Sequence, residues 1–162
     1  MRSVLLVLIP AFLAMVAMGC RPPAPETAPE RTAQQMRADT EALVAQWRNL
    51  ANSGDAAGVA ALYSDDAVFV DPFGGVHQGP EAIAAYLRET FAGPVEYQIE
   101  VFGVVSGGDL AASYGRWSRT LNDSTGPETI GGMWQSVGQY QDDGSMKTLL
   151  HHTMVPAPVP GS

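Results

Sequence analysis

Four strand-length apolar runs separated by short turns fill the second half of this 162-residue chain. The runs cover residues 95–105, 110–121, 129–140 and 146–155, and the segments between them read SGGD, NDSTGPE and QDDG. Gly, Asp and Asn in such short connections favour tight reversals between antiparallel strands. The sequence therefore predicts an antiparallel meander of long strands.

The residues before these runs have helical spacing instead. Residues 37–52 place Leu43, Val44, Trp47 and Leu50 on one face, which is typical of an amphipathic helix. Further helices are expected at residues 56–63 and 79–91, with a brief strand at 67–70. Helices followed by a long-stranded sheet make an α+β fold.

The N-terminus predicts export and attachment to a membrane. Residues 1–19 combine one cation with a short apolar run that ends next to Cys20, which is the pattern of a signal peptide. The run is shorter than the roughly 20 residues of a membrane-spanning helix. Its end, VAMGC, resembles a bacterial lipobox and predicts a lipid on Cys20, the only cysteine of the chain. Ordinary signal peptidase cleavage, which would leave a free thiol on a secreted protein, is the alternative.

The rest of the chain is expected to form one domain on a tether. Residues 20–35 are rich in Pro, Ala and Glu and predict a flexible tether, residues 36–156 the globular domain, and residues 157–162 a disordered tail. The net charge of −8 argues against nucleic acid as a partner. The expected location is the bacterial cell envelope, with the lipid as the only membrane contact and the domain on the periplasmic side.

Two stretches of the sequence carry a family resemblance. These are NLANSGDAAGVAALYSDDAVFVDPFGGVHQGPEAIAAYLRETF and the later LLHHTMV. They resemble the nuclear transport factor 2-like superfamily, in its SnoaL-like and ketosteroid-isomerase-like branch. The resemblance implies a cone-shaped, cystatin-like roll in which three helices pack in a curved, mostly antiparallel sheet. It also implies a homodimer formed through the outer face of the sheet.

The resemblance to ketosteroid isomerases places three positions of this chain on functional ones. Asp71 falls on the catalytic base, Trp47 on a hydrogen-bonding tyrosine, and Ser136 on a protonated aspartic acid, or Gln135 if the register shifts by one residue. Both hydrogen-bond donors of the isomerase site are therefore replaced by other residue types in this chain. Losing one such donor typically raises the reaction barrier by about 2.7–4 kcal/mol, so steroid isomerase activity is not expected. Asp71 could still serve an isomerase, dehydratase or cyclase as general base, with its pKa raised by burial against aromatic side chains. It could equally just cap a turn before Pro72.

The resemblance further implies an apolar pocket at the open end of the cone. Its expected lining residues are Trp47, Tyr63, Phe73, Tyr86, Trp134 and Ser136. His151 and His152 occupy adjacent strand positions and must face opposite sides. His152 is predicted to face the pocket, either as a second catalytic candidate or as a structural histidine, and a one-residue bulge would reverse that choice.

The arginines of the second long strand and the loop histidine are expected to have no role in a binding site. Arg116 and Arg119 are expected to be exposed or ion-paired, and His77 to be a solvated loop residue. No metal-binding spacing or cofactor motif is present in the sequence, so no metal or cofactor is predicted. The leading functional expectation is binding of a small, largely apolar molecule. An enzyme using Asp71 and a protein-interaction module without ligand are the alternatives.

Overall fold

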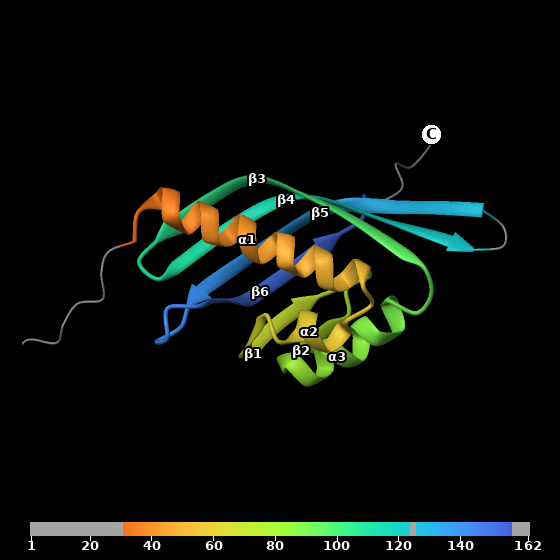
Figure 1. The fold of residues 1–162 in the computed structure, drawn as a ribbon, viewed down its shortest axis with the longest axis horizontal. Helices are drawn as coiled ribbons and strands as arrows, with labels where there is room; N and C mark the ends of the chain where they lie inside the picture. The colour runs from red at the N-terminus through yellow and green to blue at the C-terminus, as the bar shows by residue number, and fades with distance from the viewer. Residues whose placement is uncertain (1–30, 124–125, 157–162) are drawn as a thin grey trace, which may run out of the picture.

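The computed structural model describes residues 31–123 and 126–156 (Figure 1). The predicted signal peptide, the lipid site at Cys20, most of the tether and the tail at 157–162 lie outside the described residues. No helix within the described ranges is long and apolar enough to cross a membrane.

Three helices form within the described residues, in the predicted order. They are α1 (Ala33–Asn52), α2 (Ala56–Ala60) and α3 (Gly79–Thr90). α1 begins before the predicted start at residue 37, because Thr32 caps it by accepting a hydrogen bond from the Gln35 N–H at 3.2 Å. Residues 33–35, which were assigned to the tether, therefore belong to the first helical turn.

In the part of the chain that the structure describes, six strands form a single sheet, which includes the predicted meander. They are β1 (Tyr63–Val70), β2 (Val76–Gln78), β3 (Val95–Gly107), β4 (Leu110–Asp123), β5 (Gly126–Tyr140) and β6 (Met146–Met154). Their order is β2-β1-β6-β5-β4-β3, and all neighbours are antiparallel except β1 and β6. The edge strand β2 was not predicted, because three residues are too few to show a period.

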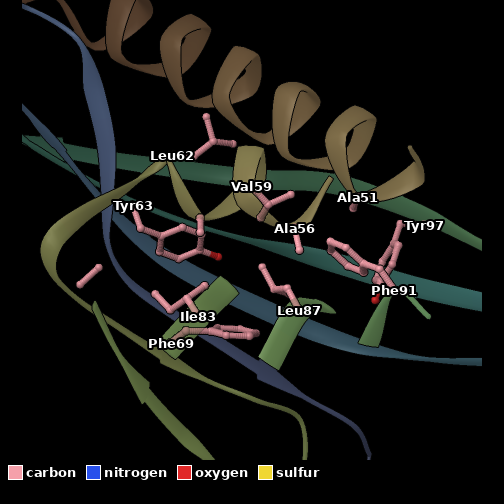
Figure 2. Packing of buried hydrophobic residues seen from close by; sticks show 12 residues of the cluster. Ala51, Ala56, Val59, Leu62, Tyr63, Phe69, Ile83, Leu87, Phe91 and Tyr97 are labelled. Atoms are coloured by element: carbon pink, nitrogen blue, oxygen red, sulfur yellow. The ribbon is translucent and has the colours of Figure 1, made fainter. Parts of the chain in front are cut away.

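The helices cover one face of the curved sheet, which confirms the predicted α+β, cystatin-like roll. Figure 1 shows α1 lying across the long strands. α2, α3 and β1 lie together near the C-terminal end of α1. The main core cluster joins these elements at that end, and Figure 2 shows its side chains converging between α2, α3 and the sheet. Ile83 and Leu87 of α3 and Val59 of α2 are almost fully buried there. The core thus closes one end of the cone and leaves space between α1 and the long strands.

Candidate functional site

A pocket lies between α1 and the concave face of the sheet. Its free volume is about 80 Å³, well above the roughly 10–15 Å³ that one water needs. The walls are mostly aromatic and aliphatic side chains from α1, α3 and strands β1, β3, β4, β5 and β6. Among the lining residues are Leu43, Val44, Trp47, Phe69, Tyr86, Tyr97, Ile99, Trp117, Ile130, Trp134 and His151.

Most of the residues predicted to line a pocket are in its wall. Trp47, Tyr86, Trp134 and Ser136 line it, as does Phe73, whose side chain is 78% exposed and so belongs to the rim. The remaining predicted residue, Tyr63, is buried behind the wall and contacts the pocket only through its neighbours.

The histidine in the pocket is His151, so the choice of His152 was wrong. Thr148 pairs with Gly138 of β5 and Leu150 pairs with Val137, which leaves Leu149 as an extra residue in β6. This bulge shifts the inward positions from Met146 and Thr148 to His151 and Thr153, all of which line the pocket. His152 lies on the outer face of the sheet, where its Nδ1 is 3.3 Å from the Gln135 amide.

His151 ends a buried chain of hydrogen bonds. The Trp47 indole N–H donates to the Tyr63 hydroxyl at 3.1 Å, and this hydroxyl is 2.6 Å from Nδ1 of His151. An indole nitrogen can only donate, so the single Tyr63 proton is free to point at Nδ1. Nδ1 is the one acceptor that the described residues place near this proton, so the pairing favours the His151 tautomer with its proton on Nε2.

Burial keeps the His151 ring neutral. Desolvation is the main cause that lowers its pKa to about 3, with a smaller contribution from neighbouring His152. No described residue accepts a hydrogen bond from Nε2, and the ring lines the pocket. The pocket therefore contains one neutral N–H donor, which the sequence did not predict because it depends on the bulge.

Asp71 caps the turn that connects β1 to β2. Its Oδ1 accepts hydrogen bonds from the N–H groups of Phe73 at 2.8 Å and Gly75 at 3.0 Å. Its Oδ2 lies 3.0 Å from Nε2 of His77, whose ring stacks on Tyr86 with centroids 4.2 Å apart. Asp71 is buried but is not among the residues that line the pocket. One carboxylate oxygen is thus occupied by the loop and the other by His77 of β2.

The pKa of Asp71 is lowered, which contradicts the predicted increase. Burial by itself raises this pKa, but hydrogen bonds from His77, Phe73 and Gly75 together outweigh burial. The prediction considered only the aromatic surroundings and missed the donors that the turn supplies. A carboxylate with a lowered pKa is a weak base at neutral pH.

Arg119 points into the pocket, whereas it was expected to be exposed or ion-paired. On β4 it shares the inward face with Ser113 and Trp117, which lie six and two positions before it on a strand of alternating side chains. Arg116 has the opposite parity, and its guanidinium lies 5.6 Å from the Phe102 ring outside the pocket. Alternation from the buried Trp117 was the signal that could have identified Arg119.

The described residues contain no group of three or more His, Cys, Asp or Glu side chains placed to hold a metal ion.

The principal polar groups of the pocket are Arg119, the His151 Nε2–H and the hydroxyl pair of Ser113 and Ser136, whose oxygens are 2.9 Å apart. This arrangement can enclose an apolar body and contact a few polar atoms.

The SnoaL-like domain family matches residues 44–144 of the chain. No curated protein matches the chain significantly. The match covers α1 from Val44, both other helices and the sheet through β5.

Several solved structures are similar in fold. A ketosteroid isomerase-like protein from Erwinia carotovora atroseptica has 21% sequence identity and a TM-score of 0.65, over 75% of this chain and 96% of that one. A nuclear transport factor 2-like superfamily protein from Salmonella enterica has 14% identity and a TM-score of 0.70, over 81% and 99%. A nuclear transport factor 2-like protein with a cystatin-like fold from Novosphingobium aromaticivorans has 19% identity and a TM-score of 0.68, over 80% and 85%. At these identities the likeness shows the fold.

Proposed function

The chain belongs to the SnoaL-like domain family, and we propose that it binds a small, largely apolar molecule between α1 and the sheet. The observation that carries the proposal is the pocket itself, which combines an apolar wall with few polar groups. Sites of this kind gain affinity from apolar burial and orientation from their few polar atoms.

The tryptophans support this function because their polar atoms are already satisfied. The three indole N–H groups donate to protein acceptors rather than to the pocket. The Trp47 N–H donates to the Tyr63 hydroxyl at 3.1 Å. The Trp117 N–H donates to the Met133 carbonyl at 3.2 Å, and the Trp134 N–H donates to the Glu100 carbonyl at 3.2 Å. A ligand therefore meets apolar ring surface that needs no further hydrogen bond.

Asp71 supports binding better than proton transfer. Its oxygens cap the loop and face His77, and its pKa is lowered. A general base must reach the proton that it removes, with a pKa near the working pH. The loop instead holds Phe73 at the rim of the pocket, and His77 of β2 stacks on Tyr86, a residue of the pocket wall.

The proposal includes a place and an assembly for the domain. The lipid on Cys20 would anchor it in the bacterial cell envelope, and the outer face of the sheet would join two copies. That face exposes large apolar side chains at Phe102, Tyr114, Met133, Leu150 and Met154.

Ligand binding can be tested with phenylnaphthylamine, a neutral apolar fluorophore. The soluble domain is expected to bind it with an increase in fluorescence. Val44→Trp fills the pocket from α1 and is expected to weaken binding roughly tenfold or more. Ala42→Trp is the matched control, because Ala42 is an exposed residue of the same helix.

Thermal melting of both variants separates loss of binding from loss of folding. If a folded Val44→Trp protein binds the fluorophore with the same affinity as the Ala42→Trp protein, the pocket is not the binding site and the proposal is wrong. Failure of the wild-type domain to bind it would do the same.

A further inference from the structure

We infer that the ligand carries a carboxylate, which Arg119 binds inside the pocket. This inference rests on the proposed binding function and specifies the chemical class of the ligand. The predicted small apolar molecule becomes an amphiphile with an apolar body and one anionic end.

Arg119 lies where a ligand would contact it. It is on β4, paired with Tyr97 of β3 on one side and Ile130 of β5 on the other, and all three residues line the pocket. Burial raises the pKa of Tyr97 to about 12, while the Arg119 guanidinium opposes that increase from close by. Burial also raises the pKa of Tyr86, and the positive charge of Arg119 acts against that increase. The guanidinium thus lies near two neutral phenols.

The guanidinium has unused hydrogen-bonding capacity. Its Nε is shielded from solvent and has no hydrogen-bond partner among the described residues. A buried donor without a partner is costly, so such groups in native proteins call for an explanation. A bound anion that accepts from Nε and a terminal nitrogen would satisfy it in the paired geometry that guanidinium favours.

No described acidic side chain neutralises this cation. Among the side chains that the structure describes, no carboxylate forms an ion pair with Arg119. Asp71, which influences the same Tyr86, is held by the loop and His77. Of the described residues that line the pocket, Arg119 alone carries a permanent charge, since His151 is neutral. An anionic ligand would balance it.

The number of charges favours a carboxylate over a phosphate monoester. One guanidinium balances one negative charge, and a dianionic phosphate would leave a second charge in an apolar enclosure. The surrounding wall of Ile99, Trp117 and Ile130 suits an aliphatic or aromatic body next to the charged end.

The test is displacement of bound phenylnaphthylamine by decanoate and by decanol, which share one chain length and differ in charge. Wild type is expected to bind decanoate roughly tenfold more tightly than decanol. Arg119→Gln should remove this preference, and Arg119→Lys should restore part of it. Arg116→Gln is the matched control, because Arg116 lies on the same strand and outside the pocket.

Each outcome separates the carboxylate inference from the proposed function. Equal binding of decanoate and decanol to the wild type overturns the inference and leaves the apolar pocket standing. A preference for decanoate that survives in Arg119→Gln, or disappears equally in Arg116→Gln, also overturns the assignment to Arg119. Failure of the fluorophore and both alkyl compounds to bind overturns the proposed function itself. The wild-type comparison needs no variant, so it holds even if Arg119→Gln fails to fold.

Discussion

At the scale of single residues, three polar side chains differ from what their chemistry alone would indicate. Asp71 is buried, yet hydrogen bonds from His77 and from two backbone N–H groups keep its pKa low. The imidazole of His151 ends a buried chain of hydrogen bonds and stays neutral. Arg119 is charged and faces an apolar pocket. In each case the partners, rather than the residue type, decide the role.

The neutral state of His151 predicts a pH dependence of stability. Its pKa is about 3 in the folded protein and 6.5 in the unfolded reference, so between these values the unfolded state binds more protons. The His151 contribution is complete above pH 6.5 and is lost as the pH falls toward 3, by at most about 1.4 kcal/mol per pH unit.

Urea unfolding of His151→Gln across this range measures the effect. The variant should lose less stability than wild type as the pH falls, whereas His152→Gln on the outer face should match the wild type. Parallel curves for wild type and His151→Gln would contradict a buried neutral ring.

At the scale of elements, close packing of strands limits the side chains that β4 can carry. A Cβ at Gly115 would overlap the Glu100 carbonyl oxygen of β3 and lie 2.8 Å from Nε1 of Trp134. That indole donates to the carbonyl oxygens of Glu100 and Arg116 at 3.2 Å each, which holds the Trp134 ring in the pocket wall. Gly115 therefore permits both the strand pairing and the position of the ring.

Gly115→Ala is expected to lower the free energy of unfolding by about 1–3 kcal/mol through overpacking. It should also weaken phenylnaphthylamine binding, because Trp134 must move. Gly107→Ala in β3 is the control, since a Cβ there meets nothing within 4 Å. Chemical denaturation that gives equal stabilities for the two variants would show that β4 adjusts to the added methyl group.

At the scale of the whole molecule, the sheet has one face that the helices leave uncovered. Met133 of β5 lies on this outer face between Arg116 and Met154, and its side chain is 40% exposed. Large apolar side chains gathered on an open sheet face are typical of an interface between protein chains. This agrees with the proposed pairing of two copies.

Met133→Glu should convert the domain from dimer to monomer, because it places a charge inside an apolar interface. Sedimentation equilibrium over a range of concentrations measures the change. Ala42→Glu adds the same charge to an exposed position of α1 and is expected to leave the dimer intact. A monomeric wild type would remove the assembly from the proposal.

Local patterns in the sequence were enough to predict the helices and the meander, and the family resemblance added the cystatin-like roll. Helical and strand periods, together with Gly and Asp at the turns, act over a few residues and can be read without the fold. The aromatic wall followed too, because Trp47, Tyr86 and Trp134 are at positions that the family resemblance specifies.

Only the tertiary structure decided the charged and titratable groups of the site. The bulge at Leu149 depends on the pairing of β6 with β5, and it brings His151 rather than His152 inward. The pKa of Asp71 depends on donors in a folded turn, and the unpartnered Arg119 depends on which charges other strands bring near it. Hydrogen bonds and charges act between atoms that are distant in sequence, so their balance exists only once the chain has folded.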